Sequence, residues 1–110
     1  MDHDDIGAET EAVDGVHLSG MAAGEETSVQ HFTIEPGARV PAHDHHHEQA
    51  GFIYEGALTF LLDAGEVTVE AGESYVLVGG ERHGAVNRGD VAVVGVDIFS
   101  PPRTDPDWAE

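Results

Sequence analysis

Apolar and polar residues alternate in short runs between glycine-centred turns over residues 28–99 of the chain. Phe60 and Leu62, and then Val67 and Val69, stand two positions apart among polar neighbours, which is the period of a strand with one buried face. The expected strands are 29–34, 51–54, 58–62, 66–70, 75–78, 84–87 and 91–99. Short strands at this spacing, with no amphipathic helical pattern, predict an all-β sandwich or barrel.

The two ends of the chain depart from this pattern. Residues 1–27 are acidic and rich in Gly and Ala, so we expect a loosely structured N-terminal arm with a short strand near 16–18. Pro101 and Pro102 end the last strand, because proline cannot donate to a ladder, and 104–110 form an irregular tail. At 110 residues the chain is one domain, and 28–103 form its folded body.

Charge and composition exclude several kinds of partner. The chain carries 22 acidic residues against four Arg and no Lys, which gives a net charge of -18 at pH 7. Nucleic acids and anionic lipids are bound through Lys and Arg, so no nucleic acid and no membrane is expected as a partner. A solvated acidic surface is one explanation of this negative charge. The absence of Lys favours a second explanation, adaptation to high salt. The acidic N-terminus does not resemble a secretory signal and no apolar run is long enough to span a membrane, so we expect a soluble, cytoplasmic protein.

Histidines gather in one segment of the chain, and the lack of cysteine limits any metal site to nitrogen and oxygen ligands. If the segment 43–49 is a strand, His43, His45, His47 and Gln49 share one face, since residues two apart point the same way. His83 lies before a later expected strand and could complete the site from a neighbouring strand. A solvated polar turn is the alternative for the segment, because a histidine-rich composition alone is weak evidence for metal binding.

The spacing of these residues resembles the two signature motifs of the cupins, which are small jelly-roll β-barrels of antiparallel strands. The first motif is matched by Gly37, His43, His45, Gln49 and Gly56, with Gln where the common pattern has Glu. The second motif is matched by Gly72, Val78, Gly80, His83 and Asn87, with Val where the pattern has Pro. The resemblance covers most of the chain and implies a cupin jelly-roll β-barrel around a metal ion.

The resemblance implies four metal ligands, His43, His45, Gln49 and His83. His47 is the alternative to Gln49, because imidazole is a better donor than an amide and both residues are expected on one face. A neutral amide leaves the full divalent charge on the site, which makes the ion a stronger Lewis acid. Three imidazoles and one amide oxygen suit one divalent transition metal ion, whether Ni, Fe, Mn, Co, Zn or Cu.

The segment 97–103 adds a second set of chemical groups. By alternation Asp97 and Phe99 face the same side as Val93, which is the expected interior, and a buried carboxyl is either paired or a possible general acid/base. Together with the first motif, this segment resembles the pectin-degradation proteins of the KdgF type, which act on 4,5-unsaturated uronates. The resemblance implies that Asp97 is the catalytic acid/base, that Phe99 binds the sugar, and that Arg103 binds its carboxylate. A structural pair between Asp97 and an arginine is the alternative.

The expected function is therefore a metal-dependent isomerase or tautomerase that promotes opening of a cyclic unsaturated uronate, a sugar acid, to its linear keto form. A non-catalytic small-molecule-binding or sensor cupin is a second hypothesis, because fold does not determine function. A cupin dioxygenase is a third. We also expect a homodimer, in which the acidic arm could exchange its first strand with a partner.

Overall fold

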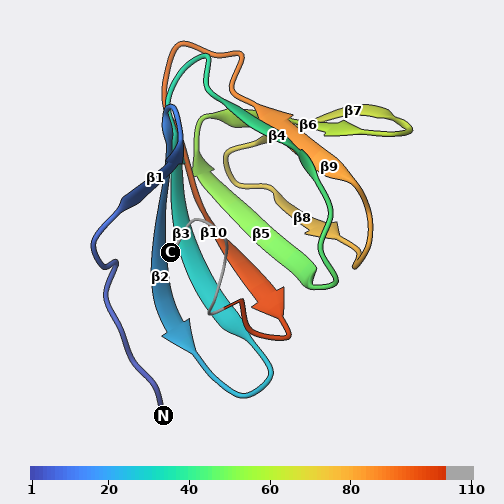
Figure 1. Cartoon of the computed structure of the whole chain (residues 1–110). Helices are drawn as coiled ribbons and strands as arrows, with labels where there is room; N and C mark the ends of the chain where they lie inside the picture. The colour runs from blue at the N-terminus through green and yellow to red at the C-terminus, as the bar shows by residue number, and fades with distance from the viewer. Residues whose placement is uncertain (104–110) are drawn as a thin grey trace.

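The structure is a computed structural model that describes residues 1–103, and within them it consists of strands and connecting loops (Figure 1). In chain order the strands are β1 (Thr10–Val13), β2 (Val16–Ala23), β3 (Ser28–Ile34), β4 (Arg39–His43), β5 (Glu48–Glu55), β6 (Ala57–Leu62), β7 (Gly65–Glu70), β8 (Ser74–Leu77), β9 (His83–Val86) and β10 (Val93–Ser100). Over the same residues, the chain forms no helix with the length and apolar character needed to cross a membrane.

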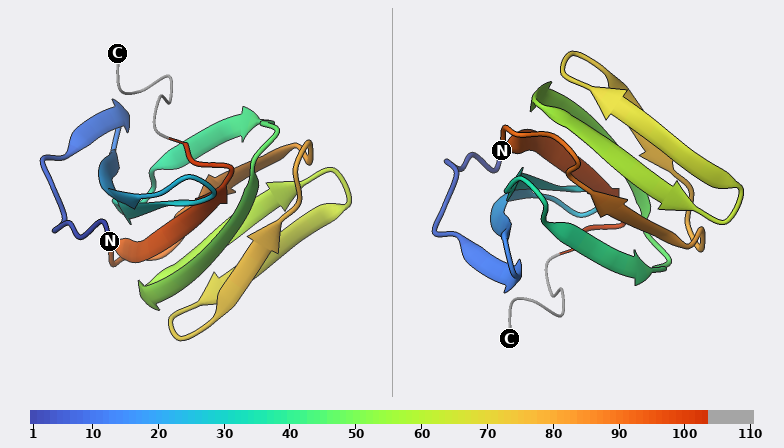
Figure 2. Two further views of the ribbon diagram at one scale, coloured as in Figure 1. Left: turned by 90° about the horizontal axis from the view of Figure 1, so that it is seen from below. Right: turned by 90° about the horizontal axis from the view of Figure 1, so that it is seen from above.

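The strands form two antiparallel sheets that face each other across the core (Figure 2). One sheet has six strands in the order β1-β2-β3-β10-β5-β8, and the other has four in the order β4-β9-β6-β7. The all-β prediction is confirmed. The sheets do not close into one hydrogen-bonded barrel as expected, because each keeps its own edge strands, and the architecture is a jelly-roll sandwich.

The core lies between the sheets and follows the alternation of the strands. Phe32 and Ile53 point inward from the six-stranded sheet and Phe60 from the four-stranded sheet, and each is at most 5% exposed. Burying such a side chain contributes roughly 1.5–3 kcal/mol to stability. The buried hydrophobic cluster as a whole contains Val16, Phe32, Ile34, Ile53, Leu58, Phe60, Val69, Leu77, Ala85 and Val93. The predicted burial of Val67 is wrong, since it lies 51% exposed on the edge strand β7.

Strand β10 is paired on both sides, with β3 and with β5. Its register sets Asp97 opposite Gln30 on one side and Gly51 on the other, and sets Phe99 opposite Gln49. Asp97 and Phe99 are both buried, which confirms the prediction that they face the interior.

The expectation of a loosely structured arm does not hold for residues 10–23, which form β1 and β2. Strand β2 pairs with β3 from Val16 to Ala23, and Val16 is 3% exposed in the core. The sequence pattern predicts only a short strand near 16–18, because the small residues after Leu18 carry a weak periodic signal. Strand β4 is also absent from the expected set, since it is short and contains Pro41.

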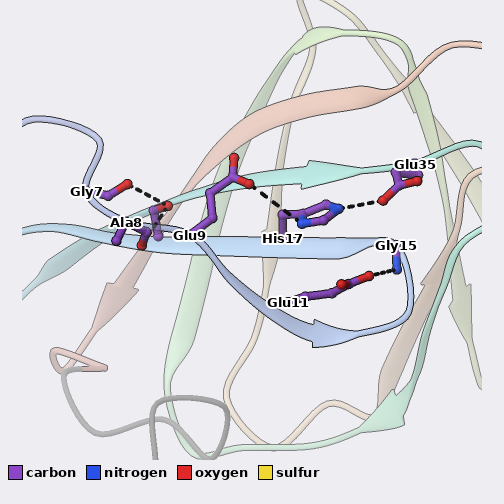
Figure 3. A network of polar contacts seen from close by, with 8 residues as sticks. Gly7, Ala8, Glu9, Glu11, Gly15, His17 and Glu35 are labelled. Carbon is purple, nitrogen blue, oxygen red and sulfur yellow. Dashed lines mark hydrogen bonds and ion pairs between the residues drawn. The ribbon is translucent and has the colours of Figure 1, made fainter.

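Ionic contacts around His17 join the N-terminal strands to the end of β3 (Figure 3). Its Nε2 lies 2.5 Å from an oxygen of Glu35, and its Nδ1 lies 3.6 Å from an oxygen of Glu9. Glu11 is the register partner of His17 and accepts a hydrogen bond from the backbone N–H of Gly15. The hydrogen bond to Glu35, followed by the charges of Glu11 and the other carboxylates, raises the pKa of His17.

A raised histidine pKa makes the contribution of His17 to stability depend on pH. The contribution is fully present below the pKa of the unfolded chain, about 6.5, and is lost as pH rises through the folded value. We expect His17→Gln to lower the denaturant midpoint of unfolding at about pH 5.5 and to have a smaller effect at about pH 9. His3→Gln, at an exposed site in the same segment, is the control. An equal loss for His17→Gln at both pH values would contradict this assignment.

Candidate metal centre

Three histidines, two from one segment and one from a later strand, meet in one place. His43 ends β4 and His83 begins β9, and the register of these two strands pairs them directly. His45 lies in the loop between β4 and β5. One possible ligand atom from each of the three side chains lies within 4.8 Å of the other two. This is the distance range over which several side chains can bind one ion.

Each of the three rings is held in the same way, by a backbone carbonyl at its Nδ1. The Nδ1 of His43 lies 3.0 Å from the carbonyl of Pro41, and that of His83 lies 3.0 Å from the carbonyl of Glu81. The Nδ1 of His45 lies 3.1 Å from the carbonyl of His47. A carbonyl only accepts, so each Nδ1 carries the proton and each Nε2 keeps a lone pair, the arrangement typical of metal-bound histidine.

The electrostatic surroundings keep the buried rings neutral. Burial, followed by the positive charge of Arg103, lowers the pKa of His45 to about 4. Burial also lowers the pKa of His83. Neutral rings have no proton to lose before they bind a metal, and imidazole nitrogen suits Zn, Cu, Fe and Ni. The donor set therefore fits a divalent transition metal ion.

Gln49 lies beside the histidines and connects them to Asp97. Its Oε1 lies 3.2 Å from the Nε2 of His45, and because both atoms carry lone pairs in this tautomer they do not hydrogen-bond but stand together as two possible metal ligands. Its side chain is hydrogen-bonded to Asp97 and to Tyr75. Since a carboxylate only accepts, the amide N–H group donates to Asp97, and the amide oxygen is left facing the histidines. A glutamate at this position could not make both contacts.

His47 has a different environment from the three converging rings. It stands outside their group, with its ring centroid 5.4 Å from that of His45. Burial is the main cause that lowers its pKa, and its ring is hydrogen-bonded to the backbone of Pro102. Its Nδ1 is the one buried side-chain nitrogen or oxygen without a hydrogen-bond partner among residues 1–103.

The expectation that residues 43–49 form one strand is wrong. Strand β4 ends at His43 and β5 begins at Glu48, because the chain leaves one sheet and enters the other between them. His43 and His45 converge because the loop turns the chain, and not because of strand alternation. The loop also explains why His47 does not join the three rings, although strand alternation predicts that it shares their face.

Asp97 projects into the same space from β10. It is 6% exposed, and one of its carboxylate oxygens accepts a hydrogen bond from the hydroxyl of Tyr75. Burial raises the pKa of Asp97 to about 6, although the hydrogen bonds from Tyr75 and Gln49 and the charge of Arg103 act in the opposite direction. A carboxyl that titrates near neutral pH suits proton transfer.

Tyr75 is a residue of this group that sequence analysis does not identify. It extends inward from β8, and burial is the main cause that raises its pKa, so its hydroxyl stays protonated and donates. Gly51 makes room for this contact, since a Cβ at that position would overlap both the Tyr75 ring and the Asp97 carboxylate. A glycine inside a strand is the signal that could have indicated such a close approach.

Phe99 and Arg103 complete the group at the end of β10. Phe99 is 1% exposed, and its ring centroid lies 5.9 Å from that of His45. The guanidinium of Arg103 stands 5.2 Å from the Phe99 ring centroid, which is within the range of a cation–π interaction. The backbone N–H of Arg103 donates to Ser28 Oγ at 2.8 Å, which fixes the chain where it leaves the sheet.

All of these residues line one cavity of about 790 Å³ between the two sheets. Histidines, Gln49, Tyr75, Asp97 and Arg103 provide its polar part. Apolar side chains of both sheets line the remainder, among them Phe32, Leu58 and Phe60. A concave, mostly apolar space with a few convergent polar groups is typical of a small-molecule site.

A second group of possible metal ligands, Glu11, His17 and Glu35, lies at the surface. Both ring nitrogens of His17 already face carboxylates, and the two glutamates are exposed (Figure 3). Ion pairing accounts for this group, and we assign no site to it.

Comparison with known proteins agrees with this architecture. Residues 30–99 match the cupin domain family. The pectin degradation protein KdgF of Dickeya dadantii (strain 3937) is 30% identical over 70 residues, which are 63% of this chain and 63% of that protein. The H2HPP isomerase of Bacillus subtilis is 34% identical over 67 residues, which are 61% of this chain and 28% of that protein. The chain thus spans less than two thirds of the length of either relative.

Solved structures show the same likeness. The structure of KdgF from Halomonas sp. matches with a TM-score of 0.80 at 25% identity and covers 90% of both chains. An RmlC-like cupin from Shewanella frigidimarina matches with a TM-score of 0.82 at 24% identity and covers 96% of both chains. Since the family match covers more than half of the chain, the protein belongs to the cupin family, and within it resembles KdgF.

Proposed function

We propose that this cupin is a metal-dependent enzyme that promotes ring opening and tautomerisation of 4,5-unsaturated uronates to linear keto sugars. The observation that carries the proposal is that one cavity brings together His43, His45 and His83 with Asp97 and Arg103. The names of its relatives, a pectin degradation protein and an isomerase, support the same class of reaction. A binding module for the same anion could also use Arg103, but it would not need a buried carboxyl with a pKa near 6.

In this proposal His43, His45, His83 and Gln49 hold one divalent ion. When bound, the ion supplies Lewis-acid polarisation of a ring or enol oxygen of the sugar. The orientation of Gln49 supports its inclusion, because its oxygen faces the histidines while its N–H group donates to Asp97. The unpartnered Nδ1 of His47 makes that residue the alternative fourth ligand.

Arg103 and Phe99 bind the substrate in this scheme. The planar guanidinium of Arg103 matches the two oxygens of a uronate carboxylate. Its stacking on Phe99 sets it at the polar end of the cavity, where it can offset the repulsion that a chain of net charge -18 exerts on an anionic sugar. Screening at high salt reduces the same repulsion, which fits our proposal that the acidic surface is an adaptation to salt.

Asp97 moves the proton that tautomerisation requires. The hydroxyl of Tyr75 and the amide of Gln49 both donate to its carboxylate, so they stabilise the ionised form that accepts a proton. Burial acts in the opposite direction and raises its pKa to about 6, so the protonated form is also accessible and can return the proton to carbon. Both forms are therefore available near neutral pH.

We expect His83→Ala to lower the affinity for one divalent ion by more than about 100-fold, because it removes a direct ligand. Elemental analysis after dialysis against excess Zn²⁺ or Ni²⁺ measures the bound metal, independently of activity. His46→Ala is the matched control, since His46 is an exposed histidine of the adjacent loop. One ion per chain in both variants would contradict the assigned ligands.

We expect Asp97→Asn to lower kcat/KM by about 10²–10⁴-fold, since the amide cannot accept the proton. The assay follows the ultraviolet absorbance of a lyase-generated 4,5-unsaturated uronate with metal-loaded protein. In the wild type kcat/KM should fall as pH drops through about 6, because Asp97 becomes protonated. The variant should not show this fall on the acidic side of the pH profile. Asp90→Asn, in an exposed turn, should retain full activity. No acceleration by the metal-loaded wild type would rule out the proposed reaction.

We expect Gln49→Glu to retain the ion at least as firmly as the wild type but to lose at least about tenfold in kcat/KM. The carboxylate cancels part of the charge of the ion and cannot donate to Asp97. Metal content and activity measured on the same preparation separate the two effects. A fully active variant would show that the amide N–H contact to Asp97 has no role.

A further inference from the structure

Gln30 is a polar side chain of the cavity that the proposed reaction does not use. It lies on β3 two residues before Phe32, so strand alternation turns both side chains inward. Gln30 lines the cavity and is 7% exposed. Among the described residues of β1, β2 and β3, Gln30 is the one polar side chain that lines the cavity. The others are apolar: Ala12, Val13, Val16, Leu18, Phe32 and Ile34.

Within residues 1–103, the side-chain amide of Gln30 has no hydrogen-bond partner. The amide is in contact with the space of the cavity, because the one fully enclosed side-chain atom without a partner in this part of the chain is the Nδ1 of His47. Burying the donors and the acceptor of an amide without partners is unfavourable. A methionine would fill the same space without that cost, so packing alone does not explain an amide at this position.

The strand register places Gln30 beside Asp97. The two residues are directly opposed on β3 and β10, so their Cβ atoms stand about 4.5–5.5 Å apart. Tyr75 and Gln49 both donate to the Asp97 carboxylate, and they come from β8 and β5 on the other side of β10 (Figure 1). The proposed metal ligand Gln49 and the amide of Gln30 thus flank Asp97 from opposite sides.

The space beside Gln30 is open on the side away from Asp97. The register partner of Gln30 on β2 is Gly20, which has no side chain. A Cβ built at Gly20 would meet no atom within 4 Å. A ligand bound at Asp97 can therefore extend over Gln30 without meeting a side chain at position 20.

We propose that the amide of Gln30 binds ring hydroxyls of the substrate and thereby selects hydroxylated sugar acids over carboxylates with an apolar ring. The inference rests on the proposed function, because it takes Asp97 as the site of proton transfer. A ring whose reacting atoms lie between the histidines and Asp97 presents its far side to β3. Two neighbouring hydroxyls of a sugar can engage the N–H group and the oxygen of the amide together. Without this contact, the apolar wall that includes Leu18 and Phe32 would favour an apolar ring.

Isothermal titration calorimetry of the protein dialysed against Zn²⁺ tests the proposal with two ligands that do not react. One is the methyl glycoside of glucuronic acid, and the other is tetrahydropyran-2-carboxylate, which has the ring and the carboxylate but no hydroxyl group. We expect the wild type to bind the uronate at least about tenfold more tightly than the second ligand. Gln30→Met should lose at least about tenfold in affinity for the uronate and keep its affinity for the second ligand.

Thr33→Val is the matched control, because it removes a polar group from the opposite face of β3. This variant should keep the wild-type preference for the uronate. Equal affinities of the wild type for the two ligands, including binding of neither, would overturn the proposal. An unchanged preference in Gln30→Met would also overturn it.

Stability separates ligand binding from a structural role. Because the amide has no partner among residues 1–103, its removal breaks no hydrogen bond, and Gln30→Met should leave the denaturant midpoint of unfolding unchanged or raise it. A lower midpoint, or failure to fold, would mark the amide as structural and overturn the proposal.

Turnover of a 4,5-unsaturated uronate by the same preparations separates this proposal from the proposed function. A wild type that turns over the uronate but does not prefer the hydroxylated ligand would exclude only the role of Gln30. A wild type without turnover would exclude the proposed reaction, whereas the binding comparison does not depend on turnover.

Discussion

Pairing of strand β10 along both of its edges is the constraint on which the rest of the structure depends. Neighbouring residues of a strand point to opposite sides, so the register that turns Asp97 and Phe99 into the cavity also turns Val96 and Ile98 to the outer face. A slip of one residue would exchange the two sets. The slip would also expose buried neighbours such as Val93. Its cost in free energy therefore keeps Asp97 and Phe99 in the cavity.

The candidate centre depends on both sheets, and therefore on the packing between them. His43 and His83 belong to paired strands of the four-stranded sheet, while Gln49 and Asp97 belong to the six-stranded one. The loop that carries His45 crosses between them. The hydrogen bonds of Gln49 to Asp97 and its contact with His45 then couple the proposed metal ligands to the proposed acid/base.

Much of this arrangement could be predicted from the sequence, because a strand with one buried face has an apolar residue at every second position. The runs that include Phe32, Phe60 and Asp97 are found as strands close to their expected limits. The convergence of His43, His45 and His83 was predicted from the spacing of the two sequence motifs and not from strand periodicity. The three rings therefore meet as expected, although the predicted strand through His45 is a loop.

The features that the sequence did not predict depend on tertiary contacts. Strands β1 and β2 lie in a segment of small and acidic residues, and they form because Val16 and its neighbours pack on a core supplied by later strands. The contact between Tyr75 and Asp97 requires a register that brings Gly51 between them. Anomalous diffraction from crystals grown with Co²⁺ tests the central claim most directly: the account predicts one peak bonded to His43, His45 and His83, and no peak among them, despite excess metal, would contradict it.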